Sequence, residues 1–131
     1  YGVGGWHPLQ ATSAPDVLEC SDHSSAWASA SSEGQDVLSV FFAAPIVASQ
    51  LDIHQSYGPG AIVSVDLILP DYSRLPLANS ADPGTDCPGI FSLPITETSP
   101  IIGAAIHLDQ TITGDWNEID AVELVGTLGA E

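Results

Sequence analysis

The alternation of apolar and polar side chains predicts a chain built from short β-strands. From Ile119 to Val125, apolar and acidic residues alternate with a period of two, as expected for a strand with one buried face. The stretches Gln50–His54 and Val63–Leu67 alternate in the same way, and no window shows a convincing helical period. The expected strands are Val37–Ala43, Val47–His54, Ile62–Leu69, Ile90–Pro94, Ile101–Leu108 and Ile119–Val125.

Short segments rich in proline and glycine separate these strands and predict turns. They are Ala44-Pro45, Tyr57–Gly60, Pro70-Asp71, Asp82–Gly84, Ser99-Pro100 and Gly114-Asp115. Ten prolines and twelve glycines fit a sandwich or jelly roll with long loops. The length of 131 residues predicts a single domain, residues 1–131, with a core of its own.

The charge balance excludes two classes of partner. Seventeen acidic residues stand against one basic residue, Arg74, which gives a net charge of −16. Such a chain cannot neutralise phosphates, so we expect neither nucleic acid nor an anionic membrane as partner. The carboxylates either attract cations, Ca²⁺ among them, or form a solvated acidic surface. The chain has no apolar run of membrane-helix length and no leader pattern, so we expect no membrane insertion and a mature secreted domain.

Two cysteines, Cys20 and Cys87, are present, and neither lies in a Cys-x-x-Cys motif. A disulfide between them would close a long loop and stabilise the fold by about 4 kcal/mol in the chain-entropy model. The alternative is a pair of buried free thiols. We expect the disulfide, and with it an oxidising, extracellular location.

Two clusters at opposite ends of the chain resemble a known family. The first runs from Trp6 to Asp16 and continues with Ser25–Ser29, and the second is Trp116–Gly126. In this order they resemble the galactose-binding-like (discoidin-type) β-sandwich family over residues 6–126. The resemblance implies an all-β, galactose-binding-like jelly-roll β-sandwich. It also implies that an N-terminal loop and the last strand meet around a structural calcium ion.

The resemblance assigns the calcium ligands. Asp16 matches the carboxylate of the N-terminal loop, Ser25 the hydroxyl ligand, and Glu118 the acid at the last strand. Backbone carbonyls would complete a shell of oxygen ligands, the kind that Ca²⁺ prefers; they are those of Ser13, Leu18 and Asn117. The loop Glu19–Ser24 is longer here than in the family. Without calcium, Asp16 would be a turn residue and Glu118 a solvated acid at a strand edge.

The start of the chain also departs from the family, which has a strand before Trp6. Here only Tyr1–Gly5 precede it, and this segment is too rich in glycine for a good strand. Either the first strand is absent, or a neighbouring molecule supplies it in trans and the domains polymerise.

Catalytic motifs are lacking in the sequence. There is no His-Glu-x-x-His and no Gly-x-Ser-x-Gly. Ser56, His54 and Asp52 are the residue types of a catalytic triad, but their spacing along one strand does not give the geometry of nucleophile, base and orienting acid. We expect no enzyme activity.

Ligand binding remains, and in this family ligands dock on loops at one end of the sandwich. An exposed aromatic side chain offers a flat face to a sugar ring. The candidate ligand-binding residues are His54, Tyr57, Tyr72, Arg74 and Trp116. The alternative places Trp27 and Trp116 in the core.

We therefore expect an extracellular, non-catalytic, calcium-stabilised recognition or adhesion module for a glycan or another cell-surface ligand. The second hypothesis is a structural subunit of an extracellular filament, sheath or matrix, assembled through the edges of the sandwich.

Overall fold

The computed structural model describes residues 20, 26–28, 34–78, 80–82 and 87–128. In this part of the chain every helix or strand element is a strand, as the alternating pattern predicts. The strands are β1 (Gln35–Tyr57), β2 (Ile62–Ile68), β3 (Arg74–Pro76), β4 (Gly89–Pro94), β5 (Ile101–Asp109) and β6 (Glu118–Leu128). None of these residues belongs to a helix long and apolar enough to span a membrane.

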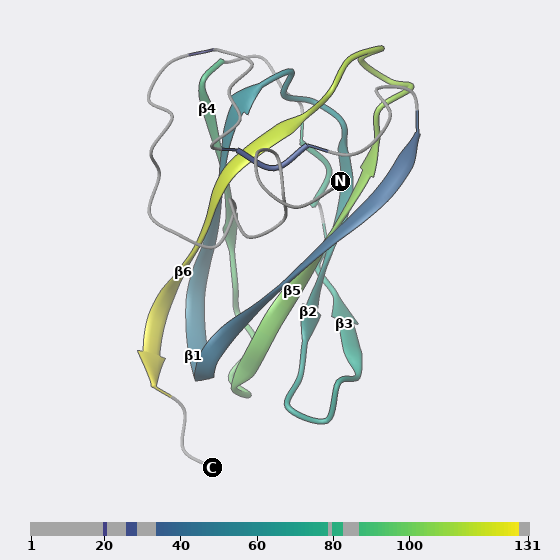
Figure 1. The fold of residues 1–131 in the computed structure, drawn as a ribbon. Coiled ribbons are helices and arrows are strands. Elements are labelled where there is room, and N and C mark those ends of the chain that lie inside the picture. The colour runs from purple at the N-terminus through teal and green to yellow at the C-terminus, as the bar shows by residue number, and fades with distance from the viewer. Residues whose placement is uncertain (1–19, 21–25, 29–33, 79, 83–86, 129–131) are drawn as a thin grey trace.

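The long strand β1 organises the sheet (Figure 1). Its first arm, residues 35–41, pairs with β5, whereas its second arm, residues 46–57, pairs with β6 on one side and β4 on the other. β1 turns sharply between the two arms, at its lower end in Figure 1. β2 pairs with the other side of β5, and β3 pairs with β2. All these pairs are antiparallel, in the order β3-β2-β5-β1-β4 with β6 beside β1.

The predicted turn at Ala44-Pro45 is wrong as a break between two strands. The backbone stays extended through both residues, and the pairing of β1 with β5 shifts between Phe41 and Ile46. Neither residue has a ladder partner within the described chain, so the missing N–H of proline costs no sheet hydrogen bond. The Ala44-Pro45 pair does mark the place where β1 changes direction.

The strand β3 was not predicted, because it has only three residues and one of them is Pro76. It lies at the edge of the sheet, where Pro76 is tolerated since an edge strand has one unpaired side. The predicted strands in β2, β4, β5 and β6 lie within three residues of the observed bounds.

One hydrophobic core holds the two arms of β1 together. Leu38 and Val40 of the first arm share it with Leu51 and Ile53 of the second. The arms therefore face each other across the core, with β2 and β5 beside the first arm and β4 and β6 beside the second. Two ends result. The loop end is where β1 and β5 finish and β6 begins. The bend end holds residues 41–46 of β1 and the loop of residues 69–73.

Candidate functional site

The predicted calcium ligands fall into two groups. Ser13, Asp16, Leu18 and Ser25 lie outside the described residues, and so does the segment Tyr1–Gly5. Asn117 and Glu118 lie at the entry to β6 and are 0% and 1% exposed.

The N-terminal segment does reach this point of the last strand. The backbone N–H of Trp27 donates to the Ile119 carbonyl at 2.7 Å, and the Ile119 N–H donates back at 2.9 Å. Trp27 is itself buried in the core, as the structural alternative for this residue predicted. Glu118 was expected to be exposed if it bound no ion, and Asp120 to lie on the polar face. Both are instead 1% exposed, at the start of β6 beside Trp27.

Asn117 joins three segments at the loop end. Its Nδ2 donates to Gln55 Oε1 at 2.9 Å, its Oδ1 accepts the Ala61 N–H at 3.1 Å, and its own N–H donates to Gln110 Oε1 at 3.0 Å. Gln55 continues the network by donating to Asp82 Oδ2 at 2.7 Å. Polar groups buried in this way must be hydrogen-bonded to each other, and here they fix the ends of three strands.

This junction offers oxygen ligands, but it is not a complete metal site in the described residues. No group of three His, Cys, Asp or Glu side chains that could hold a metal occurs among them. The carboxylate of Glu118 suits Ca²⁺ in type. The predicted ligand of Asn117 is its backbone carbonyl, and its side-chain oxygen accepts the Ala61 N–H. Calcium stays a prediction.

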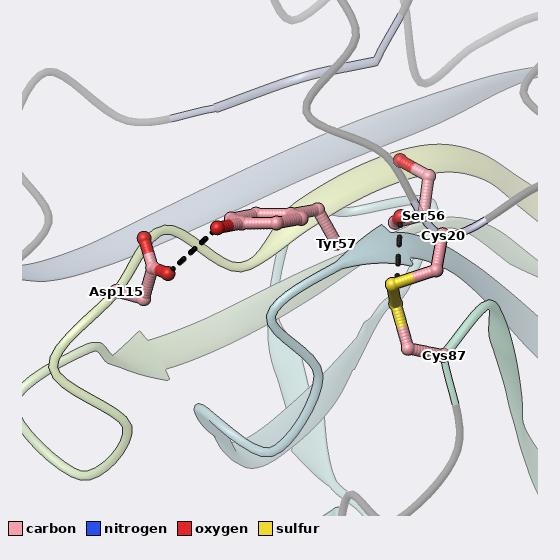
Figure 2. Close-up of a disulfide and its surroundings, with 5 residues drawn as sticks. All are labelled: Cys20, Ser56, Tyr57, Cys87 and Asp115. Atoms are coloured by element: carbon pink, nitrogen blue, oxygen red, sulfur yellow. Dashed lines mark hydrogen bonds between the residues drawn. A yellow bond between two sulfur atoms is a disulfide. The ribbon is translucent and has the colours of Figure 1, made fainter.

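Three aromatic or acidic side chains line the loop end nearby. Tyr57 donates its hydroxyl to Asp115 Oδ2 at 3.0 Å, as Figure 2 shows, and Asp115 Oδ1 accepts the Trp116 N–H at 2.8 Å. Trp116 is half-buried. Its carbonyl oxygen occupies the space that a Cβ on Gly58 would need, and Gly58 has a φ of 56°. Only glycine meets both conditions without strain.

The predicted disulfide between Cys20 and Cys87 is confirmed (Figure 2), with a Cα–Cα distance of 5.1 Å. It ties Cys20, in the N-terminal part of the chain, to the residue two positions before β4. The Ser56 carbonyl oxygen lies 3.6 Å from Cys87 Sγ, which is a packing contact because a disulfide sulfur carries no proton to donate.

A different arrangement occupies the bend end. Phe41 and Tyr72 are 55% and 71% exposed, and their rings meet edge to face with centroids 6.3 Å apart. Beside them is an open hollow of about 400 Å³. Its lining residues are mainly apolar or aromatic; besides these two rings they are Phe42, Ala43, Ala44, Pro45 and Ile102.

The loop between β2 and β3 fixes the position of Tyr72. The Tyr72 N–H donates to the Leu69 carbonyl at 2.8 Å, and the Leu69 N–H donates to the Ser73 carbonyl at 2.9 Å. Tyr72 has a φ of 68°, a left-handed conformation that disfavours a bulky side chain. Hydrogen bonds from the Ser73 hydroxyl and N–H to Asp71 Oδ1 brace the loop and lower the pKa of Asp71 below 3.8.

The structure therefore divides the predicted ligand-binding residues. Tyr57 and Trp116 lie at the loop end, whereas Tyr72 lies at the bend end and Arg74 follows on the exposed strand β3. His54 lies on the second arm of β1, with its Nε2 3.2 Å from Glu123 Oε1. The five residues do not form one site.

Sequence reasoning missed Phe41 as a binding candidate. It was counted as part of an apolar strand, although it precedes Phe42-Ala43-Ala44-Pro45, an apolar run ending in proline. Two adjacent aromatic residues cannot both face the core of an alternating strand. That rule was the available signal that one of the pair is exposed.

The residues of a conceivable triad are kept apart. Ser56 is 1% exposed and Asp52 Oδ1 accepts a hydrogen bond from Gln50 at 2.7 Å. His54 meets Glu123 and not Ser56.

Comparisons with known proteins agree with this architecture. The family model described as the C-terminal SD scarf domain of pappalysin-1 matches residues 1–131. A search of curated proteins finds no match. Among solved structures, CBM32-1 from a family 31 glycoside hydrolase of Clostridium perfringens is similar over 95% of this chain and 90% of that chain, with a TM-score of 0.68 and 10% identity.

Allantoicase structures are also similar. One covers 79% of this chain at a TM-score of 0.58 and 10% identity, and that from Saccharomyces cerevisiae covers 81% at a TM-score of 0.56 and 11% identity. This chain spans about a third of each allantoicase chain (32% and 33%). At such identities the likeness concerns the fold alone. The fold is a galactose-binding-like β-sandwich, as the sequence resemblance implied.

Proposed function

This chain belongs to the family of the C-terminal SD scarf domain of pappalysin-1, and we propose that it is an extracellular, non-catalytic module that binds a glycan. The observation that carries the proposal is the pair of exposed rings, Phe41 and Tyr72, beside the apolar hollow at the bend end. The similar fold of a structure titled as a CBM32 module supports the same class of ligand.

The geometry of Tyr72 favours recognition over a role in folding. A tyrosine that packs in the core would be buried, yet this ring is 71% exposed. Its left-handed backbone costs roughly 1 kcal/mol relative to glycine, and the ring recovers part of that by its contact with Phe41. A binding role explains why a large aromatic side chain stands at a position suited to glycine. Arg74, two residues further along the chain, is exposed on β3 and carries hydrogen-bond donors.

The extracellular location rests on the disulfide. Structural disulfides persist in oxidising compartments and are rare in the cytosol. The bridge between Cys20 and Cys87 therefore supports secretion to the cell exterior or surface.

An array of neutral, sialylated and sulfated glycans tests the proposal directly. We expect the protein to bind a subset of the array, and we expect Tyr72→Gly to lose that binding because the stacking face is removed while the backbone conformation is retained. The matched control is Ile112→Gly, which removes a side chain that is 61% exposed in the turn at the loop end. A Tyr72→Gly protein that binds like the parent would refute the site at the bend end.

Calcium forms the second part of the proposal. We propose that Ca²⁺ stabilises the junction of the N-terminal segment with β6, using Glu118 together with the ligands predicted in residues 13–25. The Trp27–Ile119 pairing supports it, because it brings the N-terminal segment beside this carboxylate. An ion that binds only the folded state raises the free energy of unfolding, and with it the melting temperature, by an amount that grows with the logarithm of its concentration over Kd. EDTA should therefore lower the melting temperature of the parent and leave Glu118→Gln unchanged. If EDTA and Ca²⁺ give the same melting temperature for the parent, as they do for Glu118→Gln, the chain holds no such ion.

A further inference from the structure

Arg74 is the single Lys or Arg of a chain that carries seventeen acidic residues, and it is exposed at the start of β3. Within the part of the chain that the structure describes, its guanidinium forms no ion pair. The ion pairs found there are those of His54 with Glu123 and of His107 with Asp66. An arginine that pairs with none of the described carboxylates is available to a ligand.

Strand register places Arg74 on the same outer face as the aromatic rings of the bend end. Ile68 of β2 pairs with Arg74 on one side and with Gly103 of β5 on the other, and Gly103 pairs with Phe41 of β1. Directly opposite residues of antiparallel strands point to the same face. Leu67, next to Ile68, lies in the core, so the whole row faces outward.

This row is compact beneath the rings. A ring atom of Phe41 and the Cδ1 atom of Ile68 lie 3.1 Å and 3.4 Å from the position that a Cβ on Gly103 would take. Ile68 is 2% exposed, so the floor of the row is closed, whereas the rings of Phe41 and Tyr72 above it are open to solvent. Neighbouring strands are about 4.8 Å apart, which puts the backbone of Arg74 roughly 10 Å from that of Gly103. A sugar that rests on the two rings therefore lies within reach of this long side chain.

The carboxylates next to this row are already engaged. Asp71 Oδ1 accepts hydrogen bonds from the Ser73 hydroxyl and N–H, and Asp66 Oδ2 lies 2.8 Å from His107 Nε2. More distant carboxylates act over lengths at which salt screens them, since the Debye length is about 8 Å at physiological ionic strength. One negative group can therefore bind at Arg74 despite the net charge of −16.

We infer that the glycan recognised at the bend end terminates in an acidic sugar with one carboxylate, which Arg74 binds while the sugar ring lies on Phe41 and Tyr72; this rests on the glycan binding proposed above. A guanidinium presents paired N–H donors in a planar fork that matches the two oxygens of a carboxylate. Sialic acids and uronic acids both carry this group.

The charge of the chain also limits the ligand to a single negative group at this site. The first carboxylate of a polyuronate would meet Arg74, but the following ones would meet a surface with no second Lys or Arg. Like charges on the two partners repel each other. A polyanion should therefore bind more weakly than a sugar with one terminal carboxylate.

Titration calorimetry with two matched pairs of ligands tests the inference. The pairs are methyl β-glucuronide with methyl β-glucoside, and 3′-sialyllactose with lactose, so the two arms distinguish a uronic acid from a sialic acid. In at least one pair the acidic member should bind about tenfold more tightly, the effect of one charge-assisted hydrogen-bonded contact. Added NaCl should reduce this preference. Equal affinities within both pairs would overturn the inference.

Variants of Arg74 test the contact itself. In Arg74→Gln the ratio of acidic to neutral affinity should fall to about one, and in Arg74→Lys it should be intermediate, because lysine keeps the charge but lacks the planar fork. Ile112→Glu is the matched control, since it makes the net charge more negative by the same amount at an exposed position of the loop end. It should keep the preference. A preference that survives in Arg74→Gln, or that is lost in Ile112→Glu, would contradict a contact at Arg74.

The outcomes separate this inference from the proposed function. If the neutral sugars bind as well as the acidic ones and Tyr72→Gly abolishes that binding, the acidic ligand is overturned and glycan recognition at the bend end stands. If none of these sugars and no glycan of the array binds, both proposals fall. Tighter binding of hexagalacturonate than of a single uronate at low salt would overturn the limit to one negative group.

Discussion

At the loop end of the sandwich, Gln55, Gln110 and Asn117 are buried and hydrogen-bonded, whereas at the bend end Phe41 and Tyr72 are 55% and 71% exposed. A disulfide and the pairing of Trp27 with Ile119 further tie the loop end. At the bend end, backbone hydrogen bonds and one ring contact hold the loop of residues 69–73.

The difference separates stability from recognition. Buried polar networks and cross-links stabilise a structure but leave no side chain available to a ligand. Exposed aromatic rings add little to the stability of the free protein and can stack on a ligand. Substitutions at the loop end should therefore lower the free energy of unfolding with little direct effect on glycan binding. Substitutions at the bend end should weaken glycan binding with little effect on the free energy of unfolding.

Removal of the disulfide should give the largest change in stability. The double substitution of Cys20 and Cys87 to Ser frees a loop with a sequence separation of 67 and should lower the free energy of unfolding by about 4 kcal/mol. Urea denaturation of parent and variant measures it. The folded variant should still bind the glycan that the parent binds, and a loss of binding in the folded variant would contradict the separation of the two ends.

Asn117→Ala should have the next largest effect. It leaves the Ala61 N–H and Gln55 Oε1 without their partner in a buried site, at a total cost of roughly 3 kcal/mol. Denaturation of Asn117→Ala measures the loss, with Gln50→Ala as a control because Gln50 is only half-buried. Equal stability of the two variants would show that the network at Asn117 contributes nothing.

Tyr72→Gly should change stability by less than about 1 kcal/mol. Glycine relieves the left-handed backbone at φ 68°, and this gain offsets the lost edge-to-face contact with Phe41. Thermal unfolding at equal protein concentration provides the measurement. A large loss of stability in this variant would mean that the ring supports the fold, and the contrast between the two ends would then fail.

The smallest effect concerns pH. Hydrogen bonds from the Ser73 hydroxyl and N–H lower the pKa of Asp71 in the folded protein below its ordinary value of 3.8. A carboxyl whose folded pKa is depressed contributes stability above its unfolded pKa and loses it as the pH falls through the folded value. The loop that holds Tyr72 should therefore loosen only below pH 3.8.

The NMR shift of the Ser73 amide should follow this titration, and Asp71→Asn should remove it. A Ser73 amide that titrates at or above pH 3.8 in the parent would contradict the lowered pKa.

The sequence determined the position of most strands, the disulfide and the fold family. Alternation in Ile119–Val125 and Val63–Leu67 reflects burial of one strand face, which is a local property that each segment carries by itself. The pairing of Cys20 with Cys87 followed because these are the two cysteines of the chain.

Only the tertiary structure decided which distant residues meet. It placed Tyr57 and Tyr72 at opposite ends, and it put Phe41 beside Tyr72 because β1 turns between residues 41 and 46 instead of ending there. It also buried Asp120, which the alternating pattern assigned to an exposed face, at the start of β6 where Trp27 pairs with Ile119. Such outcomes depend on contacts between segments far apart in sequence, and no local pattern records them.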